Sequence, residues 1–136
     1  MSLARQLPRT TAESAPFWGG GAHGQLLIQQ CAHCLKYHHP PLPICPVCLG
    51  REVRPTPVSG RATVHSHTVN HQPWLPGMAV PFVVAYVALD EQPDVWLMSN
   101  IIGCEPEEVF IGQPVEVCFE QQEDVWIPLF RPRSAS

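Results

Sequence analysis

Charged side chains are scarce in this chain of 136 residues: they make up 15% of it, against about a quarter in an average soluble protein. Only 8 residues are Lys or Arg, and the formal net charge is -4. Both numbers disfavour non-specific nucleic-acid binding, because that binding relies on clustered cations. Long apolar runs are also missing, since none approaches the roughly 20 residues of a membrane-spanning helix. The composition therefore predicts no membrane segment and no polyanion-binding surface.

A secretory leader is a further absence, because no basic stretch followed by an apolar stretch opens the sequence. We therefore expect a cytoplasmic protein whose thiols stay reduced. Proline, in contrast, is abundant at 16 residues. Because proline ends helices and is excluded from central strands, this number favours short strands with irregular connections. A chain of this length has room for one modest core and a small additional unit.

Four of the six cysteines form two short pairs, Cys31 with Cys34 and Cys45 with Cys48, separated by ten residues. Each C-x2-C turn presents two thiolates to one tetrahedral zinc ion, and two such turns complete a closed site. Residues 25–55 offer little else for a core, so the spacing predicts a rubredoxin-like zinc ribbon with one structural zinc. Four sulfur ligands leave no open position for water or substrate, so the zinc is expected to be non-catalytic.

Two other interpretations of the cysteine pairs remain open at this point. A pair of disulfides would need an oxidising compartment, which the missing leader disfavours. A thioredoxin-like redox motif needs a strand before the pair and a helix after it. Pro46 lies inside the second pair, and no helical pattern follows either pair. Metal binding therefore ranks first.

The second half of the chain changes character, because β-branched and aromatic residues alternate there with polar ones in blocks separated by turn residues. Glu105 to Glu108 predicts one helical turn between the third and fourth blocks, with Pro106 at its start. Three strands, a helical turn and two strands are the order of a five-stranded OB barrel, so the predicted fold class is all-β. The five blocks are Val58 to Asn70 with a bulge or sharp coil at Gly60, Val80 to Leu89, Val95 to Ile102, Pro114 to Gln121 and Val125 to Phe130.

The arm before the ribbon carries a short helical turn, predicted around Ala12 to Trp18, and then three glycines. Phe17 and Trp18 either dock a partner or cover the edge of the domain's own core, and covering is the more common role of aromatics near a terminus. We expect four parts in the chain: an N-terminal arm over residues 1–24, the ribbon over 25–55, the OB-fold domain over 56–132 and a tail over 133–136.

A second candidate contact region is the connection between the first two predicted strands of the barrel, a usual ligand-binding loop of OB folds. Three large apolar residues occur in it: Trp74, Leu75 and Met78. If they are exposed, they suit an acyl chain or a partner surface. In the alternative, Trp74 folds back as a plug over the end of the barrel, and the sequence leaves both interpretations open.

The catalytic candidates all have ordinary explanations. His65, His67 and His71 are predicted on one face of the first strand by its period of two. Such a face is usually solvated, and no carboxylate lies near them in sequence to orient an imidazole. Cys104 and Cys118 each lie in an apolar strand, where a free cysteine acts as a small hydrophobe. The sequence therefore predicts no catalytic site.

Several short motifs follow one another along nearly the whole chain. They are Pro16-Phe17-Trp18, Gly24-Gln25-Leu26, the two cysteine pairs, Pro40-Pro41, Ser59-Gly60-Arg61-Ala62-Thr63-Val64, Asn100-Ile101-Ile102-Gly103-Cys104, Ile111-Gly112 with Pro114-Val115-Glu116-Val117, and Pro128 with Phe130 and Pro132. Their order and spacing resemble a family of zinc-ribbon OB-fold proteins long catalogued as a domain of unknown function and linked to acyl-CoA metabolism.

The resemblance implies a non-catalytic accessory subunit that shapes or gates an acyl-CoA site. Members of the family accompany thiolase-like enzymes, including the lipid-transfer-protein-like aldolases of steroid side-chain breakdown, or acyl-CoA hydratases, so the implied partner is a thiolase-like or hydratase-like enzyme. The alternative function is binding of single-stranded nucleic acid, in which Trp74, Trp96 and Trp126 would stack on bases. That function ranks second because the sequence lacks the cationic track for phosphates.

Overall fold

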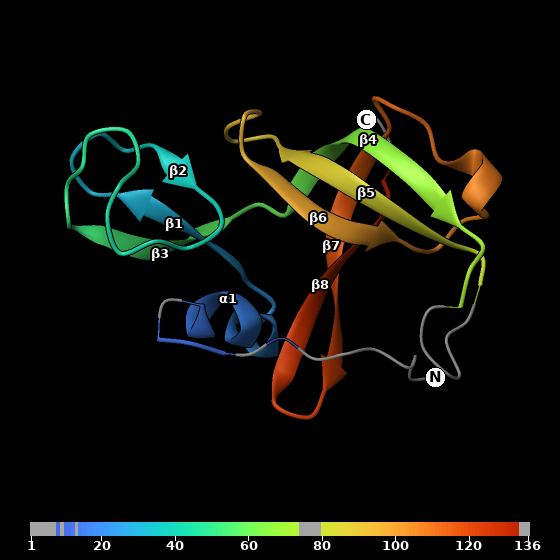
Figure 1. Cartoon of the computed structure of the whole chain (residues 1–136), viewed down its shortest axis with the longest axis horizontal. Helices are drawn as coiled ribbons and strands as arrows, with labels where there is room; N and C mark the ends of the chain where they lie inside the picture. The colour runs from blue at the N-terminus through green and yellow to red at the C-terminus, as the bar shows by residue number, and fades with distance from the viewer. Residues whose placement is uncertain (1–7, 9, 13, 74–79, 134–136) are drawn as a thin grey trace.

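A computed structural model of the chain describes residue 8 and residues 10–12, 14–73 and 80–133. A small three-stranded sheet lies beside a closed five-stranded barrel, and a short helix lies below the junction between them in the view of Figure 1. The elements are α1 (Ala15–Gly19), η1 (Gly20–His23), β1 (Leu26–Cys31), β2 (Tyr37–His38), β3 (Val53–Val58), β4 (Arg61–Asn70), β5 (Phe82–Leu89), β6 (Trp96–Ile101), η2 (Pro106–Glu108), β7 (Pro114–Gln122) and β8 (Val125–Pro132).

The three-stranded sheet has the antiparallel order β2-β1-β3. β1 pairs along its whole length with β3, from Leu26 opposite Val58 to Cys31 opposite Val53. Two residues of β3 are prolines, Pro55 and Pro57, and a strand with prolines is tolerated at the edge of a sheet because the missing N–H groups face away from the ladder. This sheet carries the cysteine pairs.

The barrel has the order β4-β5-β6-β8-β7 and closes by pairing of β4 with β7. The predicted OB order of three strands, a helical turn and two strands is confirmed. One buried apolar cluster fills the barrel and continues through Leu26 and Ile28 of the ribbon to Phe17 of the arm. Because core residues of all three parts contact one another, the ribbon and the arm are packed against the barrel.

One strand assignment from the sequence is wrong. Val58 to Asn70 does not form a single strand with a bulge or sharp coil at Gly60, because β3 ends at Val58 in the ribbon's sheet and β4 starts at Arg61 in the barrel. Gly60 is the corner between the two sheets and has a φ of 83°, a conformation that glycine adopts without steric cost. The expected boundary between ribbon and barrel at residue 55 stays a prediction. β3 extends across this position.

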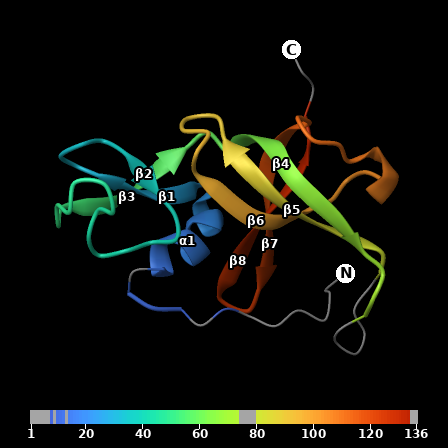
Figure 2. The same cartoon turned by 45° about the horizontal axis from the view of Figure 1, so that its top comes forward.

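The arm begins its helix later than the sequence pattern indicates, at Ala15, and continues as a 3-10 turn that ends at Gly24 with a φ of 70°. α1 and η1 lie along the β7–β8 hairpin (Figure 2). A Cβ atom on Gly21 would lie 2.6 Å from atoms of Phe119 and Trp126, so glycine permits this close approach. No helix among the described residues is long and apolar enough to cross a membrane.

Candidate functional site

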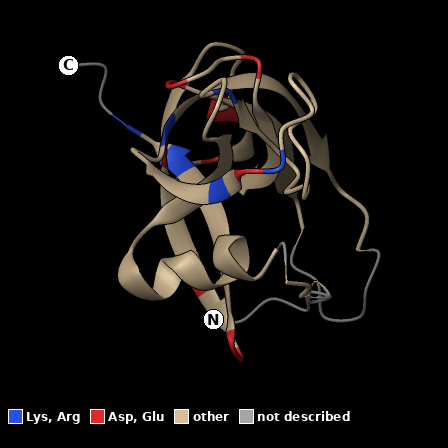
Figure 3. Cartoon of the chain, turned by 90° about the vertical axis from the view of Figure 1, so that its left-hand side faces the viewer, with Lys and Arg blue, Asp and Glu red and all other residues tan. Residues whose placement is uncertain are grey.

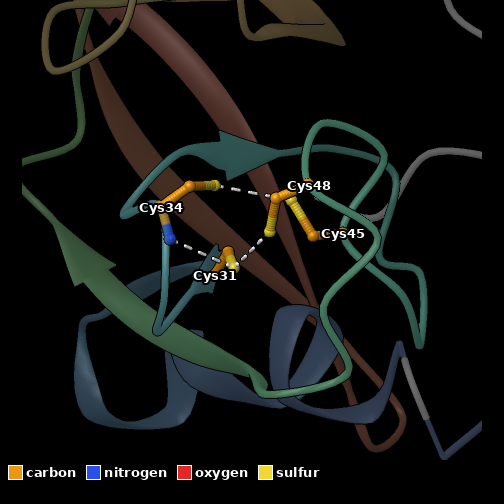
Figure 4. A group of neighbouring side chains, drawn as sticks. All are labelled: Cys31, Cys34, Cys45 and Cys48. Carbon is orange, nitrogen blue, oxygen red and sulfur yellow. Dashed lines mark hydrogen bonds between the residues drawn. The ribbon is translucent and has the colours of Figure 1, made fainter.

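The sulfur atoms of Cys31, Cys34, Cys45 and Cys48 lie within 4.8 Å of one another. Sγ of Cys31 is 3.5 Å from Sγ of Cys48, and Sγ of Cys34 is 3.6 Å from Sγ of Cys45. Figure 4 shows the four side chains converging from the two C-x2-C turns, here called knuckles, one with Cys31 and Cys34 and one with Cys45 and Cys48. Zn–S bonds of about 2.3 Å place tetrahedral sulfurs about 3.8 Å apart, so the four thiolates fit one zinc ion.

Backbone N–H groups of each knuckle point at its first sulfur. Sγ of Cys31 accepts hydrogen bonds from the backbone N–H groups of His33 and Cys34, at 3.4 and 3.5 Å, and Sγ of Cys45 accepts one from Val47 at 3.4 Å. The bond from Cys34 is the main cause that lowers the pKa of Cys31 to about 6. A depressed pKa favours the thiolate, the form that binds metal.

The two knuckles also share a backbone feature that the sequence does not reveal. Leu35 and Leu49, each directly after a cysteine pair, both have a φ of 64°. The backbone N–H of each donates to the carbonyl of the first cysteine of its pair, at 3.0 Å for Leu35 and 2.9 Å for Leu49. Left-handed leucines cost about 1–2 kcal/mol each, so the knuckles must be held by other interactions, of which metal coordination is the strongest available.

The rival interpretations of the cysteine pairs do not fit this geometry. All six cysteines are free, and no helix follows either pair before β3 begins at Val53. The free thiols rule out the disulfide pairing in this structure, and the absence of a helix after each pair removes the context of a thioredoxin-like motif. The ribbon therefore holds one structural zinc.

The three histidines of the first barrel strand do not share a face, so that prediction is wrong. A bulge between Val64 and Ser66 shifts the register of β4 on β5. His65 lies in the bulge, is exposed, and stacks on Trp96 with ring centroids 4.2 Å apart. His67 lies after the bulge, and its buried Nδ1 has no hydrogen-bond partner among the described residues. His71 follows the end of β4.

Cys104 and Cys118 are half-buried and pack against the apolar clusters of the barrel. Burial is the main cause that raises the pKa of both thiols. The carboxylates of Glu108 and Glu105 add to this effect at Cys104. A raised pKa disfavours the nucleophilic thiolate, as expected for cysteines that act as small apolar groups.

The arm residues have two different environments. Phe17 is buried in the core, as the covering interpretation predicts, and its ring contacts Trp18 edge-on at 4.8 Å. Trp18 is half-buried and packs against both apolar clusters. Whether the two residues bind a partner stays a prediction. The second candidate region, with Trp74, Leu75 and Met78, lies outside the described residues.

A groove that the sequence did not single out lies between α1, the Pro40-Pro41 turn of the ribbon and the outer face of β5 and β6. Its volume is about 690 Å³, and Tyr86, Trp96 and Met98 line its barrel side. A second hollow of about 360 Å³ continues from Trp18 and Met98 toward β8. The sequence does not mark this face, because Trp96, Leu97 and Met98 are consecutive apolar residues of β6 and both faces of β5 are apolar.

A four-cysteine ribbon joined to a five-stranded OB barrel defines the class of zinc-ribbon OB-fold proteins. Two family models match successive parts of the chain: the rubredoxin-like zinc ribbon domain of ChsH2 over residues 18–54, and the C-terminal OB-fold domain of ChsH2 over residues 55–120. A solved structure described as an Ltp2-ChsH2(DUF35) aldolase superposes with a TM-score of 0.83 at 32% identity, covering 93% of this chain and 98% of that chain.

Two curated relatives agree with this assignment. A DUF35 domain-containing scaffold protein of Methanocaldococcus jannaschii is 31% identical over 98 residues, which are 71% of this chain and 68% of that protein. A probable enoyl-CoA hydratase alpha subunit of Thermomonospora curvata is 33% identical over 129 residues, which are 94% of this chain and 40% of that protein. The chain thus spans about two fifths of the hydratase subunit. It belongs to the DUF35 family of zinc-ribbon OB-fold proteins, and the resemblance drawn from the motifs is confirmed.

Proposed function

We propose that this chain is a non-catalytic accessory subunit of an acyl-CoA-processing enzyme, either a thiolase-like aldolase or a hydratase. The observation that carries the proposal is the similarity in fold and sequence to the chain of the Ltp2-ChsH2(DUF35) aldolase, which covers 93% of this chain and 98% of that chain. The hydratase alpha subunit among the relatives points to the same class of partner, and the scaffold protein points to a supporting role.

The chemistry of the described residues supports the assignment of catalysis to the partner. Among them, the four ribbon cysteines are the only group of three or more metal-ligating or acidic side chains close enough to share an ion. Zinc with four thiolates has no open position for substrate. The two remaining thiols have raised pKa values. The role left to this chain is to hold or shape the site of another protein.

Co-purification tests the proposed function. The tagged chain is expressed in its native host, isolated under mild conditions and analysed by mass spectrometry. We expect a thiolase-like or hydratase-like enzyme in near-stoichiometric amount, with acyl-CoA turnover that falls when the accessory chain is removed. Recovery of no such enzyme, or turnover of acyl-CoA substrates by the isolated chain, would contradict the proposal.

Binding of single-stranded nucleic acid is the second candidate, because exposed aromatic rings lie on the second and third barrel strands, the usual ligand face of OB folds. Tyr86 and Trp96 offer the stacking surface. However, residues 59–133 contain ten of the 12 acidic residues and three of the 8 basic ones. Figure 3 shows Lys and Arg as separate patches and not as a track. Tight oligonucleotide binding with a steep salt dependence would reverse this ranking.

A further inference from the structure

The barrel side of the groove presents three large apolar side chains to solvent. Tyr86 is 40% exposed, Trp96 44% and Met98 63%. Tyr86 of β5 is directly opposite Met98 of β6, so their side chains lie next to each other on the outer face. Trp, Tyr and Met are enriched in protein interfaces, and the first two dominate their binding energy. This face has the composition of an interface.

Trp96 is held in place by contacts that exist within the chain. Its indole N–H donates to the carbonyl of Pro93 at 3.0 Å. Its ring stacks on the ring of His65, with centroids 4.2 Å apart and an interplanar angle of 24°, and the ring centroid of Tyr86 lies 6.2 Å from that of Trp96. Because the rotamer is already fixed, a partner that covers this ring loses little conformational entropy on binding.

The opposite walls of the groove are fixed by the ribbon and the arm. The ring of His39 contacts the ring of Phe17 at 4.8 Å, which places the following Pro40-Pro41 turn beside α1. The side chain of Gln92 accepts a hydrogen bond from the backbone N–H of Tyr37 and donates one to the carbonyl of Tyr37, both at 3.0 Å. This pair of bonds clamps the ribbon to the β5–β6 loop, so the groove is formed before any partner binds.

Asp94 is the charged residue of the groove. His39 also lines it, but burial lowers the pKa of His39 to about 4 and leaves that ring neutral. Two other acids of the same loop are compensated: Asp90 pairs with Arg133 at 3.1 Å, and Glu91 accepts from the backbone N–H of Ser59. Among the described residues, Asp94 has no such partner. A carboxylate covered by a partner is costly unless a cation accompanies it.

We propose that this groove is a docking surface for a protein partner, which inserts apolar side chains between Trp18 and Met98 and brings a Lys or Arg to Asp94. The negative charge of Asp94 favours a protein over CoA or a polynucleotide as the occupant. CoA and polynucleotides carry phosphates, which the unpaired carboxylate repels, whereas a basic side chain beside an apolar one is complementary to this surface. The identity of the partner rests on the proposed function above; the location of the contact does not.

The first test changes the apolar face. Met98→Glu is compared with Ile111→Glu, since Met98 and Ile111 are 63% and 68% exposed but Ile111 lies outside the groove. The enzyme that co-purifies with the wild-type chain is titrated onto each immobilised variant. We expect Met98→Glu to weaken binding at least tenfold and Ile111→Glu less than twofold. Both variants should keep one zinc per chain and the wild-type melting temperature.

The outcomes separate the docking surface from the proposed function. If the wild-type chain recovers an acyl-CoA enzyme and Met98→Glu binds it equally well, the docking surface is wrong and the proposed function stands. If the wild-type chain recovers a protein of another class, the proposed function fails, and the docking surface stands only if Met98→Glu weakens binding of that protein while Ile111→Glu does not. Equal loss of binding by both variants would also overturn the assignment, because the effect would not belong to the groove.

The second test changes the charge. Asp94→Lys is compared with Glu107→Lys, an exposed acid of η2 remote from the groove lining. We expect Asp94→Lys to weaken partner binding about tenfold. Asp94→Asn should flatten the salt dependence of partner binding, whereas Glu107→Lys should change neither the affinity nor its salt dependence. Palmitoyl-CoA is titrated onto the chain alone in the same series. Palmitoyl-CoA binding that Met98→Glu abolishes and Asp94→Lys strengthens would show a ligand site instead and overturn the proposal.

Discussion

The sulfur atoms of this chain lie in two contrasting environments. In the ribbon, backbone N–H groups point at Cys31 and lower its pKa to about 6. In the barrel, burial of Cys104 and Cys118 raises their pKa values, and no comparable set of N–H donors surrounds them among the described residues. The same side chain is therefore a metal ligand in one part of the chain and a small apolar group in the other.

This contrast predicts slow alkylation of Cys104 and Cys118 in the zinc-loaded protein. Because the folded-state pKa lies above the ordinary value of 9.0, the thiolate fraction at pH 7.5 is smaller in the folded chain than in the unfolded one, and it grows as pH rises past 9. Iodoacetamide labelling followed by mass spectrometry from pH 7 to 10 measures it, with the guanidinium-unfolded chain as reference. Faster labelling of the folded chain at pH 7 would identify an activated thiol instead.

The metal ligands could be predicted from the sequence, whereas the docking face could not. A C-x2-C turn sets the distance between its two thiolates by local geometry, so the spacing of Cys31 and Cys34 carries the information by itself. Tyr86 lies in β5, whose residues on both faces are apolar. Such a strand has no polar face that would identify its solvent-exposed side. The burial of Val87 and the exposure of Tyr86 follow only from the closure of the barrel.

At the scale of elements, Gly60 separates two strands that the sequence pattern joins. Residues on both sides of it favour strands, so the sequence shows no boundary; the boundary arises because β3 pairs with β1 while β4 pairs with β5. The backbone carbonyl of Gly60 accepts a hydrogen bond from the N–H of Val117 at 2.8 Å. The chain thus passes from ribbon to barrel at a point where β7 lies close to the backbone.

Gly60→Ala is expected to destabilise the protein by about 2–5 kcal/mol. A positive φ costs a non-glycine residue about 1–2 kcal/mol. The added Cβ would also lie 2.4 Å from Cγ1 of Val117, and overpacking of this kind typically costs about 1–3 kcal/mol. Gly112→Ala is the matched control, because its φ is 92° but nothing lies within 4 Å of the new Cβ. Urea unfolding should give about 1–2 kcal/mol for the control; equal losses would remove the steric part of the explanation.

At the scale of the whole molecule, the zinc ribbon, the arm and the barrel form one structural unit. Phe17, Leu26 and Ile28 lie in the same buried cluster as the barrel residues, and Gln92 joins the barrel loop to β2. The ribbon also supplies one wall of the docking groove through Pro40. Zinc is therefore expected to act on partner binding through the shape of this groove and not through chemistry.

Two substitutions separate the folding role of zinc from its effect on the groove. Cys45→Ser should lower zinc content, thermal stability and partner binding together, because metal binding contributes folding free energy in so small a unit. Gln92→Ala removes the clamp to Tyr37 but no metal ligand, so it should keep one zinc per chain while partner binding weakens several-fold. Gln121→Ala is the control, since among the described residues its side chain hydrogen-bonds only to the carbonyl of Glu123, in the turn of the β7–β8 hairpin. Zinc analysis, melting curves and titration with the co-purified enzyme measure the three quantities. Unchanged partner binding by Gln92→Ala would show that the position of the ribbon does not control the groove.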